Sequence, residues 1–166
     1  MFVDYNQMPA QARIWIYQAP KNLNTNEQIE IGQAAQKFIE QWTAHQQTLR
    51  ASYQIKYDRF LIIALDESLT AASGCSIDSS VNFLRAIAQN YQIDFLDRSQ
   101  VAYWQNDTIQ NMPLAEIKRA VQNGEILPET IIFNNSLTML SDLADKWQIQ
   151  AQDSWLARYF VPQKQV

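Results

Sequence analysis

The chain has 166 residues, of which 47% are hydrophobic and 18% are charged, and its formal net charge is −4. This composition is typical of a folded globular protein, and the acidic balance argues against a partner bound by neutralising phosphates. We therefore expect no nucleic acid among its partners. The opening residues lack the pattern of a secretion signal, no apolar run is long enough for a membrane span, and a single cysteine suits a reducing cytoplasm.

Taken in order, the chain alternates helical and strand patterns. Residues 1–11 are polar and are expected to form an N-terminal arm, and the β-branched and aromatic residues 13–18 predict a strand. Apolar residues at helical spacing from Ile31 to Trp42 predict a helix from about residue 25 to about residue 46. The pattern next predicts a half-buried strand at residues 51–57, a turn at 58–59 and an apolar central strand at 60–65. An amphipathic helix at 77–88 and a further strand at 101–104 follow.

This order is strand, helix, strand, strand, helix, strand, which predicts an α+β fold of the ferredoxin-like, split βαβ (βαββαβ) type. The expected core is residues 12–105, and residues 106–166 form an extension that packs on it within a single domain, 1–166. The extension begins with a turn at Asn106–Asp107 and a short strand at residues 108–109. Its other expected elements are a helix that starts near Met112 and ends before Gly124, a strand at 130–133, a helix at 136–147 and an aromatic tail.

The stretch Asp66–Ser79 connects a predicted strand to a predicted helix and holds the only cysteine, Cys75. Ser76 is the expected N-cap of that helix. Thiols beside helix N-termini are often activated nucleophiles, so Cys75 is a candidate catalytic residue. The alternative is a buried packing role for Cys75, which the usual behaviour of cysteine favours.

His45 and Asp78 are the candidate partners of Cys75. In a split βαβ fold the first helix ends where the second begins, which would bring His45 to the same end of the molecule as Cys75, with Asp66 and Glu67 nearby. A thiol, a base and an orienting carboxylate are the parts of an activated nucleophile. A histidine near a helix C-terminus also has a purely structural explanation, through the helix dipole.

Several stronger patterns are absent from the sequence. It contains no G-x-x-x-x-G-K-[ST] loop, and its three glycines at 32, 74 and 124 cannot form a phosphate-binding turn. One histidine and one cysteine do not make a zinc site. We therefore expect no cofactor and no metal.

One face of the predicted sheet carries the aromatic residues Trp15, Tyr17 and Tyr53, and it is a candidate binding face. Aromatic sheet faces bind RNA in some proteins of this fold, but the acidic charge disfavours that function here. An exposed face of this kind would favour aggregation, so we expect it to be covered, either by the C-terminal third or by a second subunit of a homodimer.

The segments Gly74–Asp78, Gln41–His45 and Asp153–Arg158 resemble a family of small uncharacterised bacterial cytosolic proteins, over roughly residues 12–160. Some members of that family are labelled ABC-transporter ATPases. This sequence lacks the phosphate loop and the glycine-rich signature that such an activity needs. The resemblance implies no catalytic residues.

These observations predict a cytoplasmic protein that works by binding either a protein partner or a small molecule. The alternative is a thiol-dependent enzyme or redox-sensitive protein that uses Cys75, with His45 as base and Asp78 polarising the site. RNA binding and ATP hydrolysis are less favoured.

Overall fold

The computed structural model describes residues 1–162, which form a mixed α/β protein with antiparallel sheets and four α-helices. The α+β class expected from the sequence is confirmed. The chain divides into two compact units: unit 1 comprises Met1–Asp97 and Asn135–Asp142, and unit 2 comprises Arg98–Asn134 and the residues from Leu143 on. Each unit has an antiparallel sheet and a hydrophobic core of its own.

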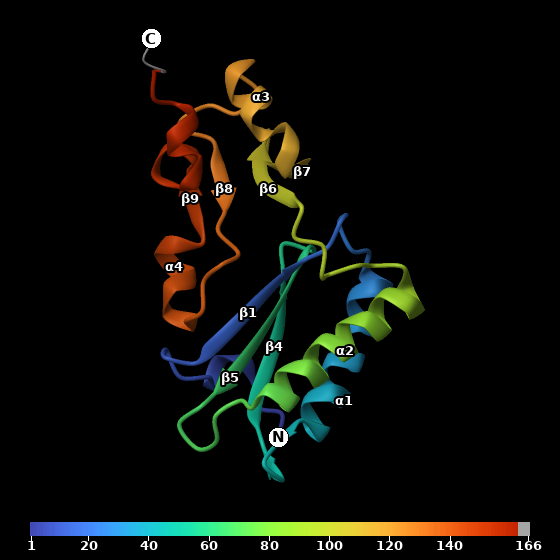
Figure 1. The fold of residues 1–166 in the computed structure, drawn as a ribbon. Coiled ribbons are helices and arrows are strands. Elements are labelled where there is room, and N and C mark those ends of the chain that lie inside the picture. Colours follow the sequence, from blue (N-terminus) through green and yellow to red (C-terminus); the bar gives the residue numbers. More distant parts are fainter. Residues whose placement is uncertain (163–166) are drawn as a thin grey trace. The chain divides into compact units, whose positions relative to one another are not determined.

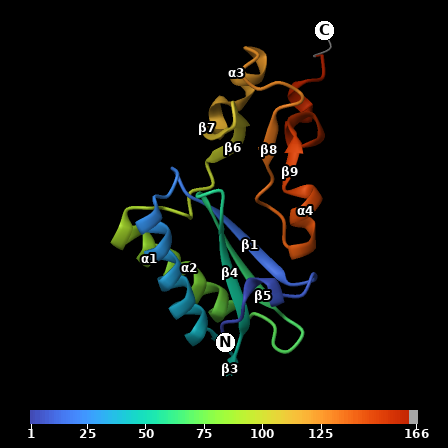
Figure 2. The same ribbon diagram turned by 180° about the vertical axis from the view of Figure 1, so that it is seen from behind.

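Unit 1 consists of a three-stranded sheet in the order β1-β5-β4, with two long helices side by side on one face (Figures 1 and 2). The central strand β5 is buried along its whole length, as its apolar sequence predicts. The elements of unit 1 are the 3-10 helix η1 Tyr5–Gln7, β1 Arg13–Gln18, α1 Thr25–Gln41, the hairpin β2 Thr43–Ala44 and β3 Gln47–Thr48, β4 Arg50–Lys56, β5 Phe60–Asp66, α2 Gly74–Tyr91 and the 3-10 helix η3 Leu140–Asp142.

Both helices bury one stripe at helical spacing against the sheet. In α1 the stripe includes Ile31, Ala35 and Ile39, and in α2 it includes Leu84 and Ile87. Fully burying one such aliphatic side chain contributes about 1.5–3 kcal/mol. The buried stripe of each helix determines which of its faces packs on the sheet.

Glycine at position 32 permits a close approach of α1 to β4. A Cβ atom at Gly32 would lie 2.7 Å from the hydroxyl oxygen of Tyr53, well inside van der Waals contact. Any side chain at position 32 would therefore displace Tyr53 or push the helix away from the strand.

Backbone segments from elsewhere in the chain pair with both edges of this sheet. The Val3 amide donates to the Ala51 carbonyl and the Ala51 amide donates to the Met1 carbonyl, both at 3.1 Å, so the N-terminal arm packs on β4. At the other edge the Ile14 amide donates to the Thr138 carbonyl at 2.9 Å. Paired edges do not offer a template for association with other strands.

The ferredoxin-like arrangement is not confirmed, because the fourth predicted strand belongs to another sheet. Residues Gln100–Gln105 form β6, which pairs with β7 and β8 in unit 2. In unit 1 the edge of β1, where a fourth ferredoxin-like strand would pair, is instead bridged by Met139 opposite Arg13. The order β1-β5-β4 thus reproduces three strands of the predicted sheet.

Unit 2 is built from shorter elements around a four-stranded antiparallel sheet in the order β7-β6-β8-β9. Its core includes Tyr103, Ile117, Ile132 and Leu156. The elements are β6 Gln100–Gln105, β7 Thr108–Pro113, the 3-10 helix η2 Leu114–Glu116, α3 Ile117–Gln122, β8 Ile131–Phe133, α4 Leu143–Lys146, β9 Gln148–Gln150 and the 3-10 helices η4 Ala151–Asp153 and η5 Trp155–Tyr159.

Three predicted helices differ from the observed ones. The helix expected to start near Met112 begins later, because Met112 and Pro113 belong to β7 and α3 is Ile117–Gln122. The helix expected at 25–46 ends at Gln41, and the chain then forms the β2–β3 hairpin. The helix expected at 136–147 is wrong over most of its length: only Leu143–Lys146 is α-helical, because the residues around Thr138 and Leu140 give their backbone groups to the edge of β1. The prediction of one domain, with residues 106–166 packed on residues 12–105, stays a prediction.

Candidate functional site

Unit 1 has a groove between the outer faces of α1 and α2, with a volume of about 630 Å³. We call it the helix groove, defined by residues 34–43 and 79–91 that line it. These residues come from the two helices, from the C-cap residue Trp42 of α1 and from the start of β2. A volume between about 300 and 1,000 Å³ is typical of ligand pockets.

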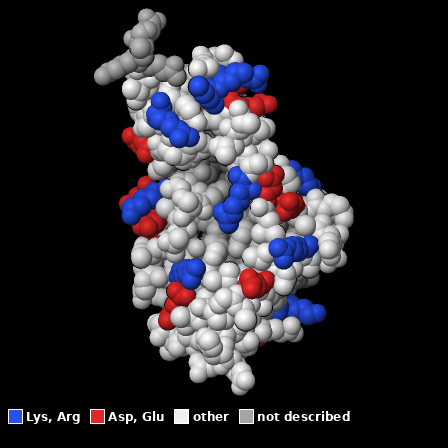
Figure 3. Space-filling view, viewed as in Figure 1, with Lys and Arg blue, Asp and Glu red and all other residues white. Residues whose placement is uncertain are grey.

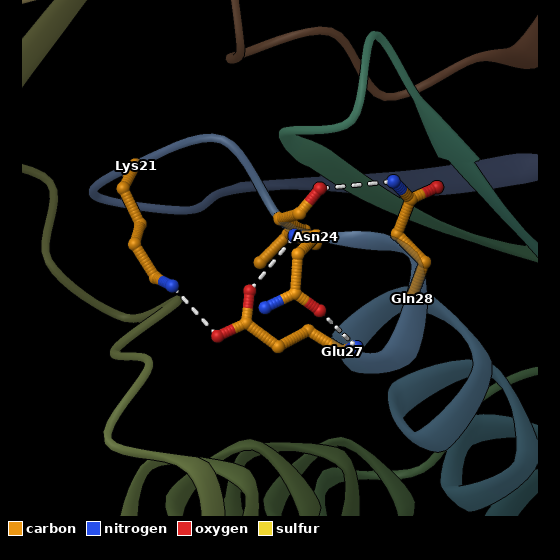
Figure 4. Close-up of polar contacts among 5 residues, drawn as sticks. Lys21, Asn24, Glu27 and Gln28 are labelled. Atoms are coloured by element: carbon orange, nitrogen blue, oxygen red, sulfur yellow. Dashed lines mark hydrogen bonds and ion pairs between the residues drawn. The ribbon is translucent and has the colours of Figure 1, made fainter.

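The start of α1 is fixed by a reciprocal capping box (Figure 4). The Glu27 amide donates to Asn24 Oδ1 at 2.8 Å, and the Asn24 amide donates to Glu27 Oε2 at 2.9 Å. Lys21 Nζ also donates to Glu27 Oε1 at 2.6 Å, and these bonds, with that from Lys21 first, lower the pKa of Glu27. Gln28 Nε2 donates to Asp58 Oδ1 at 3.0 Å, which ties the helix to the β4–β5 turn.

The start of α2 is capped in the same way, but three residues earlier than the sequence predicts. Ser73 is the N-cap: its side chain accepts a hydrogen bond from the Ser76 amide at 3.1 Å, and Ser76 Oγ accepts one from the Ser73 amide at 2.8 Å. Ser76 is therefore a buried residue of the first turn rather than the cap. Both helices that line the groove therefore begin at a capping box.

The floor of the helix groove is aromatic. The rings of Phe38 and Phe83 stack across it, one from each helix, with centroids 4.8 Å apart and an interplanar angle of 8°. Phe38 also contacts Trp42, with centroids 5.2 Å apart. Both phenylalanines are partly exposed, so the floor is open to a ligand.

A buried hydrogen bond fastens the end of α1 to the start of α2. Trp42 Nε1 donates to the Ser76 carbonyl at 2.8 Å, and Trp42 is only 2% exposed. Its ring also meets the edge of Trp15 at a centroid distance of 6.1 Å. The predicted antiparallel pairing of the two helices is consistent with this bond.

The rim of the helix groove is polar and almost uncharged. Gln41, Asn82 and Asn90 present carboxamides, which carry both donors and acceptors, and Asn82 Oδ1 accepts from Arg85 Nη1 at 2.9 Å. Lys37 is the one charged residue among the lining residues that the structure describes. The groove therefore combines an apolar floor with adaptable hydrogen-bonding groups and a single positive charge.

The predicted catalytic residues are all at the surface. Cys75 is exposed in the first turn of α2, so the packing role that cysteine usually has is wrong here. Asp78 is exposed one turn later on the same helix. His45 is exposed at the tip of the β2–β3 hairpin, with a φ of 51°, and not in the last turn of a helix.

The hairpin that carries His45 does lie beside the connection that precedes Cys75. Thr70 Oγ1 donates to Gln47 Oε1 at 2.8 Å across these two segments. Within residues 1–162, however, no hydrogen bond or ion pair joins the side chains of His45, Cys75 and Asp78 to one another. The roles of the three residues as nucleophile, base and orienting group stay predictions.

Asp66 and Glu67, expected near the same end, have structural partners. Asp66 Oδ2 accepts from Arg50 Nη1 at 2.6 Å, and Asp66 Oδ1 accepts from the Ser68 amide at 3.0 Å. Hydrogen bonds from Ser68 and then from Arg50 lower the pKa of Asp66 against the opposing effect of burial. Glu67 accepts from the Ala72 amide at 3.0 Å and orders the connection to α2.

The predicted aromatic binding face is the face that α1 and α2 cover. Tyr17 is 5% exposed and belongs to the core of unit 1, and Trp15 and Tyr53 pack against that core and keep partial exposure. Burial raises the pKa of Tyr53. The covering helices are part of the predicted βαββαβ core itself, so this face offers little surface to a ligand.

Residues 1–162 contain no group of three or more His, Cys, Asp and Glu side chains placed to hold a metal ion. No helix among these residues is both long enough and apolar enough to cross a membrane. Compared with protein-family models, with curated proteins and with solved structures, the chain matches none.

The helix groove does not follow from the sequence pattern, because Phe38, Trp42 and Phe83 fit the apolar spacing expected of buried helix positions. Their position beside the buried residues is the signal that the sequence does contain. Phe38 precedes the buried Ile39 of α1 and Phe83 precedes the buried Leu84 of α2, so these aromatic residues make the apolar stripe of each helix wider than its contact with the sheet. A stripe wider than the surface it packs on leaves apolar side chains toward solvent.

Proposed function

We propose that this protein is a cytoplasmic, non-catalytic binding protein, and that its helix groove takes a short peptide segment of a protein partner. The observation that carries the proposal is the stacked and partly exposed Phe38–Phe83 pair on the floor of a groove of about 630 Å³. Aromatic residues flanked by a few polar groups are the usual anchors of protein recognition.

The dimensions of the groove favour a peptide over a compact small molecule. Its lining follows α2 from Ser79 to Tyr91, which corresponds to roughly 18 Å of helix at about 1.5 Å per residue. A peptide of about five or six extended residues covers that length. The carboxamides of Gln41, Asn82 and Asn90 suit the amide and carbonyl groups of a peptide backbone.

The charge of the groove selects the kind of segment. Lys37 is the one cation among the described lining residues, and no carboxylate lines the groove beside it. We therefore expect the bound segment to place an apolar or aromatic side chain on Phe38 and Phe83 and an acidic side chain near Lys37.

Nucleic acid is a poor alternative occupant. On the face drawn in Figure 3, Lys and Arg side chains form separate groups with Asp and Glu side chains between them. A net charge of −4 adds repulsion from phosphates.

The test is a selection from a random display library of 12-residue peptides on the immobilised full chain, followed by fluorescence anisotropy of the enriched peptides. Ala86→Arg places a bulky charge in the groove from an exposed helix position, and Gln89→Arg is the matched control on the same helix outside the groove. We expect Ala86→Arg to weaken binding by roughly tenfold or more and Gln89→Arg to change it less than about twofold. Enrichment of no peptide, or equal effects of the two variants, would overturn the proposal.

A second candidate function is thiol chemistry, favoured by the exposure of Cys75 in the first turn of α2. The rate of alkylation of Cys75 by iodoacetamide, measured from pH 4 to pH 10, tests it. A thiol enzyme predicts fast alkylation in mildly acidic solution and loss of that advantage in His45→Ala. A rate equal to that of free cysteine at every pH, in both proteins, would end this candidate.

A further inference from the structure

A second and independent concave surface lies in unit 2, between α3 and η5. It has a volume of about 240 Å³ and is lined by Lys118, Gln122, Arg158, Tyr159 and Val161. We propose that this pocket binds a small oxyanion, the phosphate or carboxylate group of a metabolite. The proposal does not depend on the function of the helix groove, because every lining residue belongs to unit 2.

The charge of the pocket is the first argument. Two of its lining residues, Lys118 and Arg158, are cations, and none of the described lining residues is an acid. This concentration of positive charge is found in a protein whose net charge is −4. Like charges that share a pocket repel one another, and an anion bound between them offsets that repulsion.

The absence of a protein counter-ion is the second argument. The neighbouring cation Arg119 pairs with Glu116, with Nη2 and Oε2 3.3 Å apart. Within residues 1–162, neither Lys118 nor Arg158 has a carboxylate within ion-pair distance. These two cations are therefore available for an anion from solution.

The orientation of Arg158 is the third argument. Its guanidinium carbon lies 4.9 Å from the centroid of the Tyr159 ring and 5.9 Å from that of Trp155, and its Nη2 donates to the Tyr159 hydroxyl at 3.0 Å. These contacts restrict the side chain and leave most of its five N–H donors unused. A guanidinium held in this way can present two parallel donors to an oxyanion.

The roles of the other residues follow from their chemistry. Lys118 supplies a second charge, and the Gln122 carboxamide can donate to a third oxygen atom. The Tyr159 hydroxyl accepts from Arg158, so its own proton remains available for the anion. Phosphate, with more acceptor oxygens, should bind more tightly than carboxylate if all of these donors are used.

Titration of the full chain with inorganic phosphate, and separately with acetate, at constant ionic strength tests the proposal. The measurement is the ¹H–¹⁵N shift of the Arg158 side chain, with chloride as the background anion. We expect a saturable shift, and Lys118→Gln should weaken the affinity for phosphate by roughly tenfold, because it removes one of the two positive charges of the pocket.

Arg119→Gln is the matched control, because it removes the same charge one residue away but outside the pocket. We expect it to change the affinity less than about twofold. Saturation by both anions with phosphate tighter identifies a phosphate-like group, and saturation with acetate tighter identifies a carboxylate ligand. A shift that does not saturate, or an equal loss in Arg119→Gln, would overturn the proposal.

Discussion

The two units reach a folded state by different means. Unit 1 has two capped helices, Thr25–Gln41 and Gly74–Tyr91, against a sheet whose central strand is buried from end to end. In unit 2 the strands β8 and β9 are three residues long, and the pairing of β6 with β8 aligns only Tyr103 with Ile132. Regular periodic elements thus organise unit 1, whereas short segments distant in sequence organise unit 2.

Because of this difference, we expect substitutions in the core to affect the stability of the two units differently. Long helices and strands share one large core, so removing any part of it weakens the whole unit. Short elements around a small core depend more strongly on each contact between distant segments.

The largest effect is expected from truncating a core leucine in each unit. Leu84 of α2 and Leu156 of η5 are both fully buried. Each change to alanine should cost about 2–5 kcal/mol, from lost apolar burial and the cavity left behind. Native-state hydrogen exchange should show Leu84→Ala lowering the protection of amides throughout unit 1, and Leu156→Ala lowering protection first in β8, β9 and α3. A uniform loss over both units in both variants would contradict the contrast.

The contrast also explains which elements could be predicted from the sequence. The strand at residues 13–18, the central strand from residue 60 and the turn at Asn106–Asp107 follow from local patterns, and the structure confirms them. The choice of partner strand does not follow from local patterns. Thr138 and Met139 fit a helical pattern in sequence, yet the free backbone groups at the edge of β1 bind them as an extended segment.

The candidate site shows the same limit at the level of single residues. The chain leaves the α1 helix at Trp42 and turns at His45 and Gln46, whose φ angles are 51° and 65°, without the glycine or asparagine that normally marks such a turn. The helical pattern in the sequence continues through this turn, so the prediction that His45 lies in the last turn of a helix is wrong. The pattern of serines predicts a helix start beside Cys75, and the structure has Cys75 in the first turn of α2, although the capping residue is Ser73 and not Ser76.

A loss of intermediate size is expected when the hydrogen bond between the end of α1 and the start of α2 is removed. Trp42→Phe keeps most of the buried ring but removes the Nε1 donor of the Ser76 carbonyl. We expect a loss of about 1–2 kcal/mol in the free energy of unfolding, measured by urea denaturation, because a buried hydrogen bond is lost. Trp15→Phe, which changes a partly exposed ring with no such bond, is the control and should cost less. Equal losses would show that ring volume, and not the bond, holds the helix ends together.

A smaller change in stability is expected from glycine substitutions in one hairpin turn of each unit. Gln46 in unit 1 and Asp107 in unit 2 both have positive φ, at 65° and 61°. Glycine relieves the cost of this conformation, which is about 1 kcal/mol for most residues and less for asparagine and aspartate. Thermal unfolding should therefore show a larger gain for Gln46→Gly than for Asp107→Gly. The reverse order would indicate that the Gln46 side chain makes a stabilising contact that outweighs its strain.

The smallest effect at neutral pH is expected for Tyr5→Phe in the N-terminal arm. The Tyr5 hydroxyl is buried without a hydrogen-bond partner, and burial raises its pKa to about 12. Removing an unpartnered hydroxyl deletes no bond, so the stability at pH 7 should stay the same or rise slightly.

The folded state holds the proton of the Tyr5 hydroxyl more tightly than the unfolded state does, since a tyrosine in the unfolded chain ionises near pH 10. In the wild type this contribution is complete below pH 10 and is lost as the pH rises toward 12, since unfolding then releases a proton. Urea denaturation between pH 8 and pH 12 should accordingly show a shallower alkaline loss in Tyr5→Phe than in the wild type. Parallel pH profiles would mean that the arm leaves β4 before Tyr5 ionises, and would assign the arm to the part of unit 1 that opens most easily.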